Sequence, residues 1–352
     1  MLYLALRQLL NLILSFFVLT IFTFSLAHLF PQGVSFIVDY IPVDIFSGDS
    51  LLHGSQLNNS QISNFQLNES SQTDNIFISY YHYMSQILTG HFGYSTVRGT
   101  SVFSEFFIYF PATLELSLGA IIFALGIGLP LGIFAAQHKN KWQDKLIIST
   151  SLAGSAIPIF WWAMLLVLFF SLLLGVTPVA SRIGFEYDIL PVTGFMLIDT
   201  LISKQNYAVD AFFNALHHLI LPAIVLGTIP LTAITRTTRS AMIRVLSEDY
   251  IRSAKTRGIA AVQVIWKYAL RNAMIPIITT LSLQVSVLIA GSLLTETIFS
   301  WPGAGKWLLE AVNRRDFPVI HGGILAIASF VILSHLFLDF LSMLVDPKWR
   351  HR

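Results

Sequence analysis

Long apolar stretches alternate with polar segments along this chain of 352 residues. An α-helix needs about 20 predominantly apolar residues to cross the hydrocarbon core of a bilayer. Six stretches reach this length, and they cover residues 9–30, 113–137, 149–175, 216–235, 273–298 and 322–345. The pattern predicts an all-α integral membrane protein with six transmembrane helices. We expect residues 1–30 to form an N-terminal transmembrane helix and residues 113–345 to form a core of five more.

The composition points the same way. Only 11% of the residues are charged, against about 25% in typical soluble domains, and the mean hydropathy is +0.69. The apolar run after Arg7 is too long for a cleavable signal peptide and lacks a convincing small-residue cleavage site, so we expect it to remain in the protein. The absence of cysteine excludes structural disulfides and cysteine-based zinc sites.

The longest polar region covers residues 31–112, and we expect it to form a loop outside the membrane. Its centre, residues 54–75, is rich in Asn, Ser and Gln and contains no Lys or Arg. Such a composition cannot bury a core and predicts a polar insertion without a fold of its own. Residues 346–352 form a short polar tail.

The basic residues are distributed unevenly between the two sides of the predicted helices. Residues 1–8, 138–148, 236–272 and 346–352 together hold 15 of the 21 Lys and Arg but only 4 of the 19 Asp and Glu. Cytoplasmic segments of membrane proteins carry an excess of Lys and Arg. We therefore expect both termini and the 236–272 segment to be cytoplasmic, with residues 31–112 on the outer side.

The most charged segment between two apolar stretches is residues 247–272. Ser247 is a candidate N-cap for a helix with Glu248 and Asp249 in its first turn, and Gly258 is a candidate for the glycine that ends it. The first helix has one narrow apolar stripe of Tyr250, Ile251 and Ala254. A second amphipathic helix is predicted from the spacing of Val262, Ile265, Trp266, Ala269 and Leu270. The pattern predicts a helix–Gly–helix unit at the membrane surface; the alternative is an amphipathic helix on lipid headgroups.

This unit resembles the cytoplasmic coupling loop of the membrane subunits of binding-protein-dependent ABC importers. Ala254, Gly258 and Leu270 match the general pattern of that loop, and the dipeptide and oligopeptide branch is more similar, through Asp249-Tyr250-Ile251-Arg252 and Ala269-Leu270-Arg271-Asn272-Ala273. The run from Leu294 to Gly305 (LTETIFSWPGAG) resembles the same branch. Two further segments resemble the family as a whole: Phe110-Pro111-Ala112-Thr113-Leu114-Glu115-Leu116 and Asp346-Pro347-Lys348. Residues 191–199 resemble the dipeptide permease B and Sap permease B branches.

The resemblance implies the fold of an ABC type I importer permease in a bacterial inner membrane. The chain would be the pore subunit of an ATP-driven importer that moves di- and oligopeptides, or cationic antimicrobial peptides of the Sap type, from periplasm to cytoplasm. Implied partners are a second permease subunit in a heterodimer, two ATP-binding subunits, a periplasmic peptide-binding protein and membrane lipid, with no nucleic acid. Nickel or polyamine transport by the same type of permease is an alternative, and an ion-driven secondary transporter or a receptor without a pore are alternatives of other classes.

The chain itself contains no Walker A motif, so we expect no bound nucleotide or other cofactor, and ATP hydrolysis in separate chains. Force from an ATPase subunit would enter through the coupling loop, and a bulky residue at position 258 is expected to uncouple ATP use from transport without abolishing folding. The residues expected to contact the ATPase subunit are Glu248, Asp249, Tyr250, Arg252, Ala254, Lys255, Arg257 and Gly258.

Ionisable residues inside transmembrane helices are costly and usually face a cavity or the bundle interior. Glu296 and Glu115 are the candidates for the translocation pathway, and the alternative for each is a packed hydrogen bond between helices. His217 and His218 are neighbours in sequence, so on a helix they point apart. No metal site is predicted.

Overall fold

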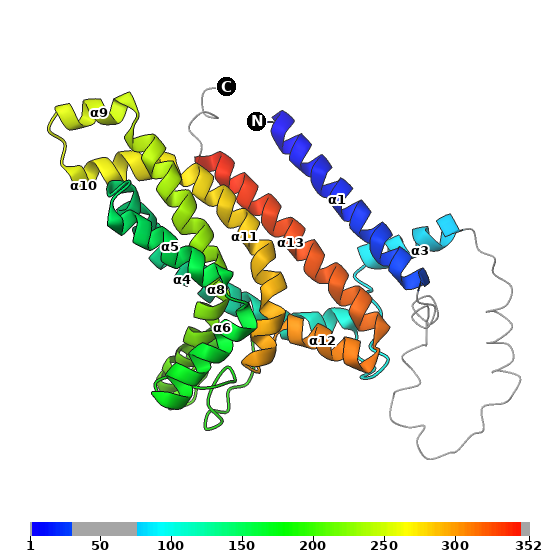
Figure 1. The fold of residues 1–352 in the computed structure, drawn as a ribbon. Coiled ribbons are helices and arrows are strands. Elements are labelled where there is room, and N and C mark those ends of the chain that lie inside the picture. The colour runs from blue at the N-terminus through cyan, green and yellow to red at the C-terminus, as the bar shows by residue number, and fades with distance from the viewer. Residues whose placement is uncertain (1, 30–75, 346–352) are drawn as a thin grey trace, which may run out of the picture.

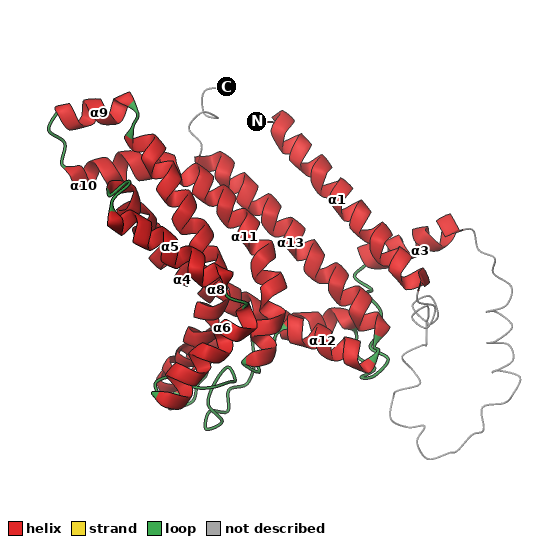
Figure 2. Cartoon of the chain, in the orientation of Figure 1, coloured by secondary structure: helices red, strands yellow, loops and turns green. Residues whose placement is uncertain are grey.

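The computed structural model describes residues 2–29 and 76–345, and helices dominate this part of the chain (Figures 1 and 2). The all-α prediction is therefore confirmed for the described residues. The elements in chain order are α1 (Leu2–Leu29), α3 (Ile76–Leu88), α4 (Val102–Gln137), α5 (Trp142–Ala156), α6 (Ile159–Leu166), η3 (Val167–Leu173), α7 (Met196–Ile202), α8 (Ala208–Leu246), α9 (Asp249–Thr256), α10 (Ala261–Gln263), η4 (Val264–Ala269), α11 (Leu270–Ile298), α12 (Ala304–Arg314) and α13 (Phe317–Val345). The predicted insertion at 54–75 and the tail lie outside the described residues.

Four helices in the described part are long and apolar enough to cross a membrane. They are Val102–Gln137, Ala208–Leu246, the continuous Ala261–Ile298, and Phe317–Leu341. A fifth crossing is formed if α5 and the α6–η3 pair count as one broken span. The apolar part of α1 that the structure describes, Leu12–Leu26, is shorter than a full span. The sixth crossing stays a prediction.

The third predicted span is not the single helix that the apolar pattern suggested. Its two halves meet at Pro158 with a bend of 103°. The residue before a proline is disfavoured in the helical region, and Ile157 is extended, with φ −77° and ψ 131°. Both halves are fastened to α8: the Trp162 indole donates to the Thr228 hydroxyl (3.1 Å), and the Thr232 hydroxyl donates to the Ser151 carbonyl (2.6 Å).

The second predicted span begins earlier than expected. We predicted a start at residue 113, but α4 starts at Val102 and runs through Pro111. Its first turns are held by tertiary packing, because Val102, Phe106 and Phe110 lie in one buried cluster with Trp307 of α12 and residues of α13. The packing of this cluster keeps α4 helical on both sides of Pro111, a residue type that in sequence alone often marks a helix boundary.

Helices α4 and α8 share the most extensive contact among the described helices, and small residues line it. Gly128 and Gly132 of α4 pack directly against Thr235 and Thr238 of α8. Nearer the other end, Gly227 of α8 packs against the Ala120 backbone. Glycine at such spacing allows the backbones of membrane helices to approach closely. This crossing holds together two of the long membrane helices of the described chain.

The ends of the helices separate into two sides of the molecule. Figure 1 places the beginning of α1 and the end of α13 on the side that carries α9, whereas α3 and α12 lie toward the other side. The side with α9 also carries the 138–141 connection between α4 and α5, where Arg239 of α8 makes two bonds to the buried Asp144 of α5 (2.5 and 2.6 Å). A membrane-spanning bundle of this shape presents two chemically different polar faces.

Candidate functional site

The turn before α9 differs from the one expected. Ser247 was predicted to cap α9, but it closes α8 instead, and its hydroxyl donates to the Arg244 carbonyl (2.6 Å). Glu248 is the N-cap of α9 through its extended backbone, without a side-chain capping bond. The sequence SEDY contains two residue types that favour N-caps, Ser and Asp, yet the N-cap falls on Glu248 between them because α8 continues as far as Leu246.

The predicted glycine at the end of α9 is confirmed. Gly258 has φ +75°, in the left-handed region. Its amide donates to the Lys255 carbonyl (3.0 Å), and the Ile259 amide donates to the Ala254 carbonyl (3.3 Å). These two bonds form the Schellman motif, which satisfies carbonyls at a helix end. A Cβ added at Gly258 would meet nothing within 4 Å in this chain.

The second helix of the unit is not separate from the membrane. Residues 261–263 continue through a π-helical stretch, Val264–Ala269, directly into α11. No glycine or proline interrupts residues 259–275, so nothing in the local sequence stops the helix. Val264 and Ala269 are buried, whereas Val262 and Trp266 are 66% and 57% exposed. The predicted helix–Gly–helix unit is therefore one short helix, a glycine turn, and the beginning of the long α11.

One apolar cluster attaches α9 to the rest of the bundle. Ile251 and Ala254 are the buried residues of α9. They belong to a cluster that also includes Ile133 and Ala136 of α4, Ala241 and Met242 of α8, Val264 and Ala269 of η4, and Ala273 and Ile277 of α11. Ala254, which was expected to contact an ATPase subunit, is 7% exposed and packs inside the chain, and that contact stays a prediction. Helix α9 therefore packs against α4, α8 and α11 in a single apolar cluster.

The opposite side of α9 is polar and exposed. It carries Glu248, Asp249, Arg252, Lys255 and Arg257. Arg252 and Asp249 lie 3.9 Å apart with side chains 78% and 99% exposed, and so open a pair contributes about 0–1 kcal/mol. Tyr250 is 42% exposed, and its hydroxyl accepts a bond from the Asn272 amide of α11 (2.6 Å). The charged side chains on this face make only weak ion pairs within the chain.

Glu296, the first pathway candidate, is fully buried at the junction of α11 and α12. Its carboxylate accepts bonds from the Thr113 hydroxyl (2.6 Å) and the Lys306 amide (2.9 Å), and the Thr113 hydroxyl accepts from the Ala304 amide (2.8 Å). Two amides in the first turn of α12 are thus satisfied from α11 and α4, and a carboxylate at a helix N-terminus is favourable. Glu296 therefore seats α12 within this chain, and its place in the translocation pathway stays a prediction.

Glu115, the second candidate, is 5% exposed and bonded on both carboxylate oxygens. It pairs with Arg182 and accepts from the Leu197 amide (2.8 Å). Arg182 also donates to the Gly194 carbonyl (3.0 Å) and lies over the Trp301 ring, with its guanidinium carbon 5.5 Å from the ring centroid. Glu115 therefore fastens the 177–195 loop to α4, and its place in the translocation pathway stays a prediction. Sequence reasoning missed Arg182, whose partner lies 67 positions away.

Three histidines have ordinary helix and loop contacts. His335 of α13 lies between the Ser282 and Ser286 hydroxyls of α11 (2.9 and 2.8 Å). His217 contacts the Val176 carbonyl (2.6 Å) and His218 the Asn214 carbonyl (2.9 Å), so the two neighbours point to different partners. Across residues 2–29 and 76–345, no group of three or more His, Asp or Glu is arranged to hold a metal ion.

The comparison with known proteins decides the family. Residues 128–351 match the family model described as "Binding-protein-dependent transport system inner membrane component". The chain belongs to this family of transport permeases. It is 44% identical over 346 residues to the di/tripeptide transport system permease protein DppB of Pseudomonas aeruginosa (strain UCBPP-PA14), with 98% of each chain covered. It is 42% identical over 358 residues to the dipeptide transport system permease protein DppB of Escherichia coli (strain K12), with 100% of each covered.

A third relative belongs to the other branch named above. The peptide transport system permease protein SapB of Salmonella typhimurium (strain LT2) is 33% identical over 347 residues, with 99% of this chain and 97% of that protein covered. The relatives are transport permeases rather than enzymes. For a permease of this family, the exposed face of α9 is the candidate site of greatest interest, because it combines an open polar surface with a rigid connection to the membrane helices.

A substitution of Gly258 tests this site by straining the backbone turn at the end of α9. A valine at position 258 must adopt φ near +75°, which costs roughly 1–2 kcal/mol for a residue with a Cβ. Asparagine tolerates this region better and is the matched control. We expect Gly258→Val to lower ATP-driven transport strongly while the protein still inserts, and Gly258→Asn to retain most of it. Uptake of a labelled peptide by whole cells with equal amounts of each variant in the membrane measures the effect; equal uptake by the two variants would contradict it.

Proposed function

We propose that this permease is the pore subunit of an ATP-driven peptide importer in the bacterial inner membrane. In this proposal the chain crosses the membrane six times, with both termini and the coupling loop 247–272 in the cytoplasm. Its partners are a second permease subunit, two ATP-binding subunits and a periplasmic peptide-binding protein. The peptide cargo is supported by the names of the relatives, two of which transport dipeptides or di/tripeptides at 42–44% identity.

The observation that carries the coupling part of the proposal is the two-sided character of α9. One side is buried in a cluster shared with α4, α8 and α11. The other side is charged and open to a partner. ATP-driven closure of the partner subunits would move α9 as a unit with these helices and rock the pore between inward-open and outward-open states. Two observations support the orientation: the excess of Lys and Arg on the α9 side and the helix ends gathered there in Figure 1.

A charge reversal on the open side of α9 tests the proposed contact. Arg252 is the test position because its side chain is 78% exposed and makes only the weak pair with Asp249. We expect Arg252→Glu to reduce recovery of the ATP-binding subunits during purification in mild detergent by about tenfold, since an unfavourable rim charge costs on the order of 1–3 kcal/mol at an interface. The matched control is Lys139→Glu, another exposed cation on the same side but in the α4–α5 connection.

The outcomes separate the alternatives. Equal recovery of ATP-binding subunits with both variants would contradict docking on α9. Recovery of the permease alone from wild-type membranes, with uptake driven by an ion gradient and insensitive to ATP, would favour a secondary transporter. Uptake of a labelled dipeptide, competed by other di- and tripeptides, is the expected result for cargo. Competition only by cationic peptides, putrescine or Ni²⁺ would reassign the substrate without changing the permease mechanism.

A further inference from the structure

Helix α3 is attached to the side of α1 rather than to its end. The hydroxyls of Tyr80 and Thr20 share a hydrogen bond, as do those of Tyr83 and Thr23, each at 2.9 Å. The Phe24 ring of α1 lies against both tyrosine rings, with centroids 5.3 and 5.5 Å apart. Figure 1 shows α3 lying across α1 before α1 ends. Hydrogen bonds and ring contacts thus fix the level at which the two helices cross.

This level lies within the apolar part of α1. Thr20 and Thr23 both belong to the apolar stretch Leu12–Leu26. Because an α-helix rises about 1.5 Å per residue, they lie about 14 and 9 Å before Leu29, where α1 ends. Where α1 crosses the membrane, α3 therefore lies below the outer end of α1 and not in the water above it.

The residues after α3 lie at a similar level on α13. The Phe92 carbonyl packs directly against Gly322, where an added Cβ would lie 2.8 Å from its oxygen. Gly322 belongs to the apolar span Phe317–Leu341. The segment from Tyr80 to Phe92 is thus held at both ends against the apolar parts of membrane helices.

The composition of α3 suits the boundary of a bilayer. Residues 75–97 contain no Asp, Glu, Lys or Arg. The 13 residues of α3 extend over about 20 Å, which is too short to cross a hydrocarbon core of about 30 Å. Apolar helices of this length are typically buried or interfacial. The three tyrosines of α3 agree with the aromatic belt found where membranes meet water.

The side chains of α3 divide into three faces at 3.6 residues per turn. The face toward the protein carries Tyr80, Tyr83 and the buried Ile87. A second face is apolar, and its members Tyr81 and Leu88 are 70% and 71% exposed. This apolar face consists of Phe77, Tyr81, Met84 and Leu88. The third face is polar and consists of Ser79, His82, Ser85 and Gln86. An apolar and a polar face side by side are what a helix lying in the interface presents.

The exposed side of α1 continues this apolar surface. Helix α1 packs against α13 and α3, and Figure 1 places it at the edge of the molecule. Phe17, whose ring lies 6.0 Å from the Tyr80 ring, is 46% exposed. Val18 and Phe22 beside it are 59% and 56% exposed. An apolar surface of this kind at membrane depth is suited to lipid chains.

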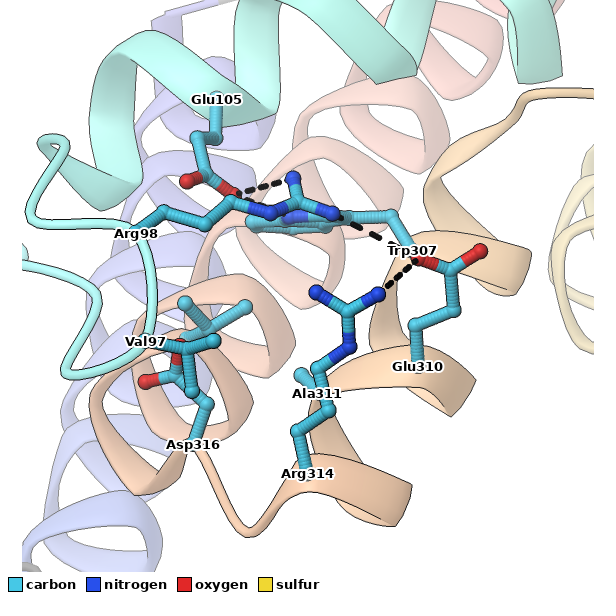
Figure 3. Close-up of a pocket in the computed structure, with 9 residues that line it drawn as sticks. Val97, Arg98, Glu105, Trp307, Glu310, Ala311, Arg314 and Asp316 are labelled. Carbon is cyan, nitrogen blue, oxygen red and sulfur yellow. Dashed lines mark hydrogen bonds and ion pairs between the residues drawn. The ribbon is translucent and has the colours of Figure 1, made fainter.

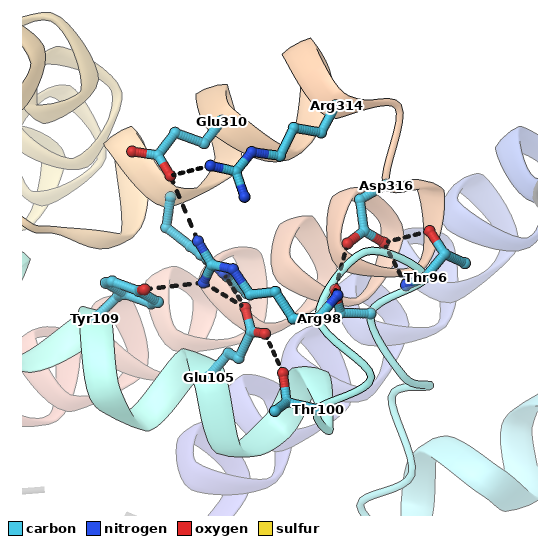
Figure 4. Close-up of polar contacts among 10 residues, drawn as sticks. Thr96, Arg98, Thr100, Glu105, Tyr109, Glu310, Arg314 and Asp316 are labelled. Carbon is cyan, nitrogen blue, oxygen red and sulfur yellow. Dashed lines mark hydrogen bonds and ion pairs between the residues drawn. The ribbon is translucent and has the colours of Figure 1, made fainter.

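The charged groups that follow α3 in the chain show where water begins. Arg98 donates to Glu105 (3.2 Å) and to Glu310 (3.4 Å), and Arg314 pairs with Glu310 (3.9 Å), as Figure 4 shows. Val97 lies beside the small hollow between these groups (Figure 3) and is 50% exposed. Val97 is therefore a reference for an apolar side chain that faces water among charges.

We infer that α3 is an interfacial helix in the outer leaflet of the bilayer, with Tyr81 and Leu88 against phospholipid chains and Ser85 toward the headgroups. Lipid is favoured over a protein partner because the apolar face is uncharged, lies at hydrocarbon depth and continues the exposed side of α1. Helix α3 thereby holds the outer part of α1 in place at the edge of the bundle. The inference rests on the proposed function, in which α1 crosses the membrane and residues 31–112 lie on the outer side.

The accessibility of single nitroxide labels tests this inference in the complex of both permeases and both ATP-binding subunits. The complex is placed in nanodiscs of phosphatidylethanolamine and phosphatidylglycerol. The chain has no cysteine, so each variant carries one label once cysteines of the partner subunits are replaced. Relaxation is measured with oxygen, which concentrates in lipid, and with a water-soluble nickel chelate. We expect an oxygen-to-nickel ratio about tenfold higher at Leu88→Cys and Tyr81→Cys than at Val97→Cys, because interfacial apolar faces lie about 5–10 Å into the acyl boundary. Ser85→Cys should resemble Val97→Cys.

Two results would overturn the inference. One is nickel access at Leu88→Cys equal to that at Val97→Cys, which would place α3 in water. The other is a label at Leu88→Cys that neither reagent reaches, which would place a protein surface such as the second permease there. Val18→Cys separates a failure of the proposed function, since nickel access at this position would mean that α1 does not lie in the bilayer. Labelling of Ser85→Cys by an impermeant maleimide only in inverted vesicles would likewise contradict the proposed orientation.

A stability measurement keeps the test independent of labels. Leu88→Asp puts a charge on the apolar face, and Ser85→Asp puts the same charge on the polar face of the same helix. We expect Leu88→Asp to lower the thermal midpoint of the complex in nanodiscs, whereas Ser85→Asp should leave it near the wild-type value. Equal midpoints for the two variants would overturn the inference.

Discussion

Replacing Gly132 with valine is expected to prevent this permease from folding into a form that survives extraction in mild detergent. A Cβ at position 132 would lie 2.6 Å from the Thr238 Cβ and 2.7 Å from the Thr235 carbonyl oxygen. Both are parts of the α8 backbone or rigidly attached to it, so the clash cannot be relieved by turning a flexible side chain. The two helices would have to separate along their shared contact. Overpacking of this kind costs about 1–3 kcal/mol in ordinary cores and more where backbones touch.

The same helix offers the control. A Cβ at Gly126 would meet nothing within 4 Å. Gly126→Ala should therefore leave the protein unchanged, or stabilise it slightly through the better helix propensity of alanine. Fluorescence-detected size exclusion after heating measures the midpoint at which the monodisperse peak is lost. We expect no such peak for Gly132→Val, a lowered midpoint for Gly132→Ala and a wild-type midpoint for Gly126→Ala.

A second substitution can show that the contact with α8 is the cause. Thr238→Gly removes the nearest atoms, and combined with Gly132→Ala it should recover part of the lost midpoint, because the Thr235 carbonyl still limits the fit. Such non-additivity is the signature of residues in direct contact. A midpoint for Gly132→Val within a few degrees of wild type would mean that α4 and α8 are less closely packed than this structure has them.

Removing the carboxylate of Glu296 is expected to have the second largest effect. In Glu296→Ala, the Thr113 hydroxyl and the Lys306 amide lose their acceptor inside a fully buried site. Each buried donor left without a partner costs about 1–3 kcal/mol, and the vacated volume adds a cavity term. Because the carboxylate holds the first turn of α12, we expect α12 to detach and the thermal midpoint to fall sharply.

The conservative variant separates this structural role from a role in transport. Glu296→Gln keeps one carbonyl acceptor and should give an intermediate loss of stability. If Glu296 lined the translocation pathway instead, Glu296→Gln would fold like wild type and change only the rate or selectivity of uptake. Glu310→Ala is the control for a carboxylate within α12, since its side chain is 39% exposed and its removal should lower the midpoint little.

Glu296 also shows how a motif can be recognised before its physical role is known. The run from Leu294 to Gly305 identified the branch of the family from sequence. The structure explains its glycines: a Cβ at Gly303 would lie 2.3 Å from the Glu296 carboxyl carbon, and one at Gly305 would lie 2.9 Å from a carboxylate oxygen. The Trp301 indole, in the same run, donates to the Ala112 carbonyl of α4 (2.8 Å). The residues of this motif hold α4, α11 and α12 together through hydrogen bonds.

The sequence by itself determined the class of the protein, most of its long helices and the glycine turn after α9. These features are local: apolar length decides what can enter a bilayer, and a left-handed position before a new helix selects glycine. The uneven distribution of Lys and Arg predicted which segments lie on the same side of the membrane. This prediction needs only the order of polar and apolar segments along the chain.

Only the tertiary structure decided what the buried polar and small residues do. Ala254 lies on a helix whose charged side alone suggested a partner, yet the α4, α8 and α11 side chains around it bury it. Glu115 and Arg182 are 67 positions apart, so no periodicity could pair them. The sequence could not show that Pro158 introduces a bend of 103°, because the prolines within α4, α8 and α11 leave those helices continuous. What separates these prolines is whether neighbouring helices satisfy the backbone groups that each one frees, and that depends on packing rather than on sequence.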